Sequence, residues 1–141
     1  RALRTADYLY TINFKPDRWP MGKLDGIETN PDISFEKLEH DTRIGIADID
    51  AGPTKAWLVL NRDKEELGEY VDYAWGKRPK YELYDLKKDP HQMVNLAEDT
   101  EYKEVREKLH QQLMQELEAN KDPRLDNDAF DRAPYWIPRK K

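Results

Sequence analysis

The stretch that most constrains how this chain can fold runs from Tyr81 to Ala97, where a short apolar segment meets an Asp-Pro turn. Leu83, Tyr84 and Leu86 are residue types that favour a β-strand. Pro90 has a fixed φ and no N–H group, so the hydrogen-bonded ladder of that strand must end before it. The sequence therefore predicts a strand, then a turn, then the start of a helix.

A second strand-forming region lies at the beginning of the chain. Residues 2–5 and 8–14 are two β-favouring runs separated by Ala6 and Asp7. In the second run one set of side chains alternates with another at the period of two that a strand requires. The pattern predicts a β-hairpin, followed at residues 15–22 by a loop with two prolines and a glycine.

Three helices are predicted after that loop. The first begins at Gly52 and Pro53, because proline is tolerated at the first helical position. The second has a capping-box-like pair, Asp63 and Glu66, and a stop signal at Gly76. Its apolar residues follow helical spacing: Leu67, Tyr70, Val71, Ala74 and Trp75.

The third predicted helix is the longest and follows Ala97. Asp99 or Thr100 is placed to cap it, and Asn120 and Pro123 end it. Its apolar stripe consists of Tyr102, Val105, Leu109, Leu113 and Leu117. Between residues 23 and 51 there is little periodicity, and Ile44, Ile46 and Ile49 form either a short strand or an irregular segment.

These elements predict an α+β fold, with a small antiparallel β-sheet and a long C-terminal helix packed on one face. At 141 residues the chain is long enough for one domain with one modest core. We expect residues 1–125 to form that domain and residues 126–141 a tail that packs back in part through its aromatic residues Phe130, Tyr135 and Trp136.

The composition excludes some classes of function. The formal net charge is -5 and charges of both signs are interspersed, so nothing predicts a nucleic-acid surface. No apolar run is long enough to span a bilayer, and we expect no membrane association. The first residue is Arg1, inside a predicted strand and without a leader, which is typical of a fragment.

Few residues offer catalytic chemistry. The chain has no cysteine and only one serine, Ser34, so a serine or cysteine triad is almost excluded. The histidines His40, His91 and His110 show no metal-binding spacing, and His110 falls on the polar side of its helix, where solvent exposure is expected. Asp48 and Asp50 are either ligands of a hard cation or, as we prefer, turn carboxylates of which one caps a helix. We therefore predict no catalytic residues and no metal site in this chain.

Candidate binding residues lie in or near the predicted loops. An exposed indole at Trp19 is typical of sugar stacking or of an interface, although Trp19 is equally able to pack over the hairpin. The cations Arg18, Lys55, Lys77 and Arg78 are able to meet an anionic ligand, or else form a solvated surface. His91 follows the Asp-Pro turn, where a turn N-terminus is able to orient the ring for a site role, although we prefer to interpret it as an ordinary polar residue. The substrate-binding candidates are therefore Arg18, Trp19, Lys55, Lys77, Arg78 and His91.

Four separated motifs, in order along the chain, resemble one family. They are RALRTADYLYTINFKPDRWPMG at 1–22, ADIDAGPTKAWL at 47–58, YAWGKRPKYELYDLKKDPHQMVNLAEDTEY at 73–102 and DPRL at 122–125. This order is similar to the C-terminal subdomain of sulfatases, especially those resembling heparan N-sulfatase (N-sulfoglucosamine sulfohydrolase). The family belongs to the alkaline-phosphatase-like superfamily.

The resemblance implies a hydrolase of sulfate esters or N-sulfo groups of glycosaminoglycan sugars, whose chemistry lies in an N-terminal catalytic domain. There a formylglycine and a calcium ion are expected as cofactors. This chain lacks the formylglycine motif, since Ser34 precedes Phe35 and Glu36, and it should hydrolyse nothing by itself. Its expected role is to support the catalytic domain, its partner, and to form one wall of the pocket for a sulfated carbohydrate.

The resemblance favours a periplasmic or secreted protein. Two other classes of function remain open, a free-standing carbohydrate-binding module and a structural or interaction domain. The carbohydrate-binding module needs an exposed tryptophan platform, and Trp57 and Trp75 lie on apolar helix faces, which is evidence against it. The interaction domain would present a large apolar patch.

Overall fold

The computed structural model describes residues 1–21, 33–46, 48–126 and 128–132. They divide into two compact units, the first formed by Arg1–Lys15 with Pro79–Lys141 and the second by Pro16–Arg78. Each unit has its own hydrophobic cluster. The sequence predicted a single core, and this expectation is wrong because the segment between the second and third strands is long enough to bury apolar residues against itself.

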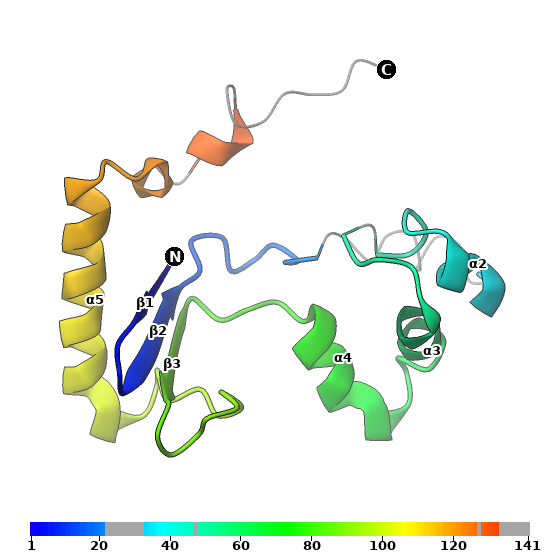
Figure 1. Cartoon of the computed structure of the whole chain (residues 1–141), viewed down its shortest axis with the longest axis horizontal. Coiled ribbons are helices and arrows are strands. Elements are labelled where there is room, and N and C mark those ends of the chain that lie inside the picture. Colours follow the sequence, from blue (N-terminus) through cyan, green and yellow to red (C-terminus); the bar gives the residue numbers. More distant parts are fainter. Residues whose placement is uncertain (22–32, 47, 127, 133–141) are drawn as a thin grey trace. The chain divides into compact units, whose positions relative to one another are not determined.

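The first unit contains a three-stranded antiparallel sheet in the order β1-β2-β3 (Figure 1). The strands are β1 (Ala2–Arg4), β2 (Tyr8–Ile12) and β3 (Tyr81–Asp85). The turn of the predicted hairpin is closed by Thr5, whose Oγ1 accepts hydrogen bonds from the N–H groups of Asp7 and Tyr8. Hairpin and third strand are both confirmed.

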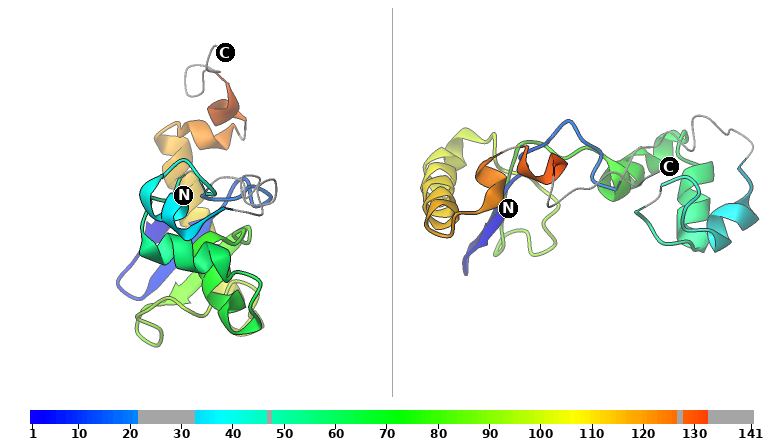
Figure 2. Two further views of the ribbon diagram at one scale, coloured as in Figure 1. Left: turned by 90° about the vertical axis from the view of Figure 1, so that its right-hand side faces the viewer. Right: turned by 90° about the horizontal axis from the view of Figure 1, so that it is seen from above.

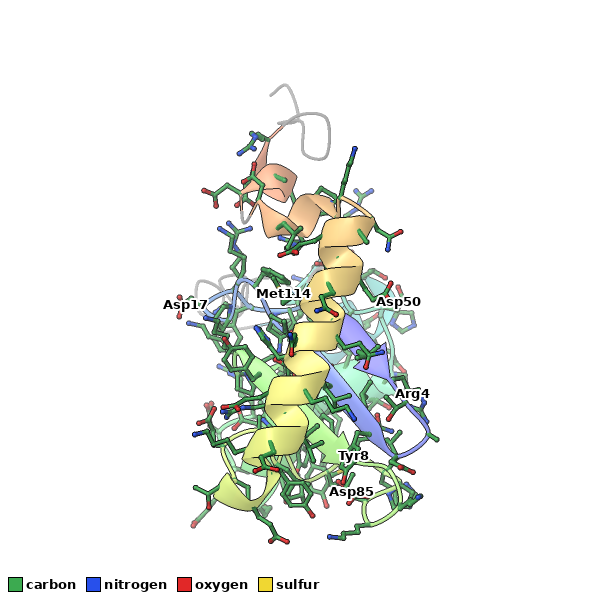
Figure 3. All side chains as sticks on the ribbon, turned by 90° about the vertical axis from the view of Figure 1, so that its left-hand side faces the viewer. Arg4, Tyr8, Asp17, Asp50, Asp85 and Met114 are labelled. Atoms are coloured by element: carbon green, nitrogen blue, oxygen red, sulfur yellow. The ribbon has the colours of Figure 1, made fainter. Side chains whose placement is uncertain are left out.

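One long helix, α5 (Lys103–Ala119), lies across one face of this sheet (Figure 3). A 3₁₀ turn at Thr100–Tyr102 leads into it, and the Asp99 carboxylate caps that turn by accepting from the Glu101 N–H at 2.8 Å. Three residues of the predicted apolar stripe are buried against the strands: Leu109, Leu113 and Leu117. The predicted α+β fold is confirmed.

The outer edge of β3 is covered by the loop that contains Asn95. Its Oδ1 accepts from the Leu83 N–H at 2.9 Å and from the Ala97 N–H at 3.0 Å, while its Nδ2 donates to the Tyr81 carbonyl at 3.1 Å. The N–H of Leu96 donates to the Leu83 carbonyl at 2.8 Å. An edge strand needs such partners, so this Asn-Leu-Ala segment stabilises β3.

β3 ends at Asp85, in agreement with the predicted break. The buried Asp85 carboxylate accepts hydrogen bonds from the N–H groups of Lys87 and Lys88, each at 3.0 Å. The Asp89 N–H donates to the Asp85 carbonyl at 2.7 Å and closes the turn. The acidic residue at the end of the strand therefore starts the turn.

Part of the C-terminal region lies against the start of the chain. The Arg1 guanidinium pairs with Asp122 at 2.8 Å, and Lys15 pairs with Asp128 at 2.5 Å. The Phe130 ring has the guanidinium groups of Arg124 and Arg1 near it, at 4.0 and 5.7 Å from its centroid. The boundary at residues 125/126 stays a prediction, and Tyr135 and Trp136 lie outside the described residues.

The second unit is helical. It contains α2 (Phe35–His40), α3 (Pro53–Leu60), a 3₁₀ turn at Glu65–Leu67 and α4 (Gly68–Trp75). Helices α2 and α3 pack against each other (Figure 2). The cluster buries Ile33, Leu38, Ile46, Ala56, Val59 and Trp75.

Several local expectations for this unit are corrected. The sequence did not predict α2, although Ser34 caps it by accepting from the Lys37 N–H at 3.3 Å. Residues 44–46, 48 and 49 are irregular, one of the two alternatives for this region, and Ile46 is buried. Six residues with one buried leucine are too short to produce a helical period.

Two predicted caps are wrong. Helix α4 begins at Gly68, after the 3₁₀ turn, and no side chain caps it, so Asp63 and Glu66 do not form a capping box. Helix α3 has Gly52 at its N-cap and no side-chain cap, so neither Asp48 nor Asp50 caps it. The Pro53 start of α3 is confirmed, as is the end of α4 before Gly76.

No helix within the described ranges is both long enough and apolar enough to cross a membrane.

Candidate functional site

The structure brings two of the candidate residues together in the second unit. Trp19 lies in the loop after the hairpin, and 36% of its surface is exposed. The Lys77 ammonium lies 5.5 Å from the centroid of the Trp19 ring. A cation over an indole face is attracted by the ring's quadrupole, so each side chain restricts the other. Together they present a partly exposed indole and a positive charge.

Arg78, next to Lys77, is held at the end of α4. Its Nη2 donates to the Tyr73 carbonyl at 2.6 Å and its Nη1 to the Asp72 carbonyl at 3.4 Å. These bonds go to carbonyls of the last turn of α4, so Arg78 acts as a C-terminal cap. Arg18 is exposed in the same loop as Trp19.

Lys55 is the least accessible candidate. Only 4% of its surface is exposed, and its ammonium donates to the carbonyls of Thr42 at 3.0 Å and Ile49 at 2.9 Å. Burial lowers the pKa of this ammonium below its usual value, since desolvation penalises the charge. Lys55 therefore ties Thr42 and Ile49 to α3, and its contacts do not favour binding of a substrate.

His91 lies in the first unit, exposed in the turn after Asp89. Asp48 and Asp50 are exposed in the irregular segment before α3. Among the described residues, no three His, Asp or Glu side chains gather where they would hold a metal ion. The five other candidates belong to the second unit.

The cofactors implied by the resemblance do not fit the residues present. Formylglycine is made from a cysteine or serine, and this chain has no cysteine and one serine. That serine, Ser34, accepts the capping hydrogen bond of α2 and is followed by Phe35. The expectation that formylglycine and calcium are held in another domain stays a prediction.

The first unit contains an aromatic cluster that the sequence did not predict. His110 was expected in solvent, but its Nδ1 lies 3.0 Å from the hydroxyl of the fully buried Tyr10. The His110 ring also meets the Tyr81 ring edge-on, with 5.9 Å between centroids. One signal was available, because His110 directly follows Leu109 of the apolar stripe and so borders the buried face of α5.

The expectation for the tryptophans is half right. Trp75 is buried, with 3% of its surface exposed, as its helical position predicted. Trp57 is 49% exposed, so it does not lie on the buried face of α3. The apolar residues of α3 that enter the core are Ala56 and Val59, which leaves the Trp57 side to solvent.

The chain resembles the C-terminal part of a sulfatase. Residues 68–119 match the family described as N-sulphoglucosamine sulphohydrolase, C-terminal. The matched segment begins with α4, includes β3 and ends with α5. The predicted resemblance to this type of sulfatase is therefore confirmed. No curated protein and no solved structure matches the chain.

Proposed function

We propose that this chain is the supporting C-terminal part of a sulfatase that hydrolyses sulfate esters or N-sulfo groups of glycosaminoglycan sugars. An N-terminal catalytic domain would be its partner and would hold the formylglycine and the calcium ion. The observation that carries the proposal is the match of residues 68–119 to the sulphohydrolase C-terminal family. The proposal assigns this chain no step of the hydrolysis itself.

The part of the chain proposed to face the sugar is the Trp19–Lys77 pair. An indole face stacks on the C–H groups of a pyranose ring, and an ammonium beside it attracts a sulfate group. Lys77 lies inside the matched segment and contacts Trp19, which lies outside it. The pair therefore joins the long loop after β2 to the family segment.

Activity provides the first test. The chain alone and a longer polypeptide with a formylglycine-bearing region ahead of Arg1 are assayed on O-sulfated and N-sulfated glucosamine. We expect sulfate release from the longer polypeptide only, with the preferred substrate deciding between S–O and S–N cleavage. Sulfate release by the chain alone would refute the supporting role.

Binding provides the second test. N-sulfated and desulfated heparin oligosaccharides are titrated into the chain and its variants, followed by tryptophan fluorescence. Trp19→Ala and Lys77→Gln should each weaken binding of the sulfated oligosaccharide about tenfold, since each removes one stacking or charged contact. Lys64→Gln, an exposed lysine of the same unit, is the matched control and should change nothing.

One observation favours a second function, a carbohydrate-binding module, since Trp57 is exposed on α3. A module that binds neutral sugars would use this indole without a cation. Trp57→Ala should then weaken binding of an unsulfated oligosaccharide, while Trp19→Ala leaves that binding unchanged. The reverse result, with loss confined to Trp19→Ala and sulfated sugar, supports the sulfatase role.

A further inference from the structure

A groove runs along one flank of α5 in the first unit. It consists of two adjoining pockets of about 430 and 330 Å³ that share Tyr81 and His110. Three α5 residues at helical spacing form its wall, namely Arg106, His110 and Met114 (Figure 3 marks Met114). The smaller pocket is lined by Ile12, Phe14, Lys80, Tyr81, His110 and Met114.

A hydrogen bond between Tyr10 and His110 holds the His110 ring beside the groove. Tyr10 is fully buried, and burial raises the pKa of its phenol to about 12, so the phenol keeps its proton at neutral pH. Its hydroxyl lies 3.0 Å from Nδ1 of His110. The other ring nitrogen, Nε2, forms no hydrogen bond with a described residue and is left for a ligand.

Two hydrogen-bond donors line the smaller pocket, the Tyr81 hydroxyl and the Lys80 ammonium. Tyr81 forms aromatic contacts, but its hydroxyl has no hydrogen-bond partner in the described part of the chain. The Lys80 ammonium lies 5.1 Å from the Tyr81 ring centroid and pairs with no carboxylate of a described residue. Glu98 and Glu107 line the larger pocket only, so no acid lines the smaller one.

We infer that the smaller pocket binds the oxyanion of a small organic acid, a sulfate or carboxylate group, with the ligand's apolar body on Phe14 and Met114. Lys80 and Tyr81 supply donors and no carboxylate lines this pocket, which is the lining that an acceptor-only group requires. Ile12, Phe14 and Met114 supply the apolar surface.

The test is a titration of the whole chain, followed by ¹H–¹⁵N chemical shifts, with four probes. Naphthalene-2-sulfonate and 2-naphthoate carry the two oxyanions, naphthalene-2-methanol has the same body without charge, and inorganic sulfate has the charge without the body. We expect saturable shifts at Tyr81, His110 and Met114 with the two acids. Both remaining probes should bind at least about tenfold more weakly, because the alcohol lacks the charge and inorganic sulfate lacks the apolar body.

Conservative substitutions identify the side chains that bind the probe. Lys80→Met should raise the Kd for naphthalene-2-sulfonate about tenfold, and Tyr81→Phe, which keeps the ring and removes the hydroxyl, about threefold. Lys108→Met, an exposed lysine of α5 outside the groove, and Tyr70→Phe, an exposed tyrosine of α4, are the matched controls. Their Kd should equal that of the unchanged chain.

The inference fails if the neutral alcohol binds as tightly as the acids, if no probe saturates, or if Lys80→Met leaves the Kd unchanged. It does not depend on the proposed sulfatase role, since the binding is measured without a catalytic domain. The hydrolysis assay therefore tests the proposed sulfatase role, and the probe titration tests the oxyanion pocket separately.

Discussion

The phenol of Tyr10 shows how a buried residue's surroundings set its chemistry. Burial raises its pKa to about 12 from an ordinary value near 10, so the folded chain holds this proton more tightly than the unfolded chain. The resulting stability is complete below pH 10 and is lost as the pH rises from 10 to 12, because only the unfolded state ionises in that window.

Tyr10→Phe tests this dependence. Between pH 10 and 12 the unchanged chain should lose about 2 kcal/mol of unfolding free energy more than the variant does, measured by urea unfolding at each pH. At neutral pH the variant should be less stable by about 1 kcal/mol, since it lacks the bond to His110. Equal alkaline slopes for the two proteins would contradict the burial argument. Tyr70→Phe, on an exposed tyrosine, is the control.

Asn95 is a second residue whose role follows from its contacts. Its amide makes three hydrogen bonds to backbone groups at and beside the edge of β3. Asn95→Ala should lower the unfolding free energy by about 1–3 kcal/mol, since the backbone groups of Leu83 and Tyr81 lose their partners. The measurement is the urea midpoint, with Gln111→Ala, an exposed residue of α5, as the control near zero.

At the scale of an element, the end of α4 depends on the missing side chain of Gly76. A Cβ there would lie 2.6 Å from the Asp72 carbonyl oxygen and 2.9 Å from its Oδ1, both closer than atoms tolerate. The φ of Gly76 is -55°, which any residue adopts, so the requirement for glycine is steric.

Substitution of two glycines in the same region tests that explanation. Gly76→Ala should destabilise the chain by about 1–3 kcal/mol, because the last turn of α4 must shift. Gly68→Ala, at the start of α4 where an added Cβ meets nothing within 4 Å, should be neutral or stabilise by about 0.5 kcal/mol. Thermal unfolding followed by circular dichroism compares them, and equal effects would refute the steric argument.

Elements also differ in how well their sequence predicts them. The stripe of Leu109, Leu113 and Leu117 predicted α5 because a long helix repeats its period several times. Helix α2 is six residues long, and its one buried residue, Leu38, gives no period. The start of α4 was misplaced because Asp63 and Glu66 have capping spacing, while the chain forms a 3₁₀ turn there.

At the scale of the whole molecule, the two units have separate clusters of buried residues. Leu113→Ala creates a cavity in the first cluster and Leu38→Ala creates one in the second. Each should lower the unfolding free energy of its unit by about 2–4 kcal/mol. Hydrogen exchange should show lost protection in α5 and β2 for Leu113→Ala, and in α3 for Leu38→Ala. Gln112→Ala is the control. Unchanged protection in those elements would contradict the packing described.

The environment of the candidate binding residues could not be predicted from the sequence either. The local sequence predicted that Trp19 and Lys77 are loop residues. Only the folded chain shows the Lys77 ammonium 5.5 Å from the centroid of the Trp19 ring. Lys55 has the same charge as Lys77, but folding buries its ammonium against two carbonyls. Charge is visible in a sequence, whereas desolvation depends on which distant segments cover the side chain.

By itself, the sequence determined the hairpin, β3, α5 and the likeness to a sulfatase C-terminal part, because strand alternation, helical stripes and proline stops act between near neighbours. Only the tertiary structure decided that His110 bonds to Tyr10 and that Trp57 faces solvent. Those outcomes depend on contacts between residues far apart in the chain, up to 100 positions for Tyr10 and His110, and no local pattern encodes such a contact.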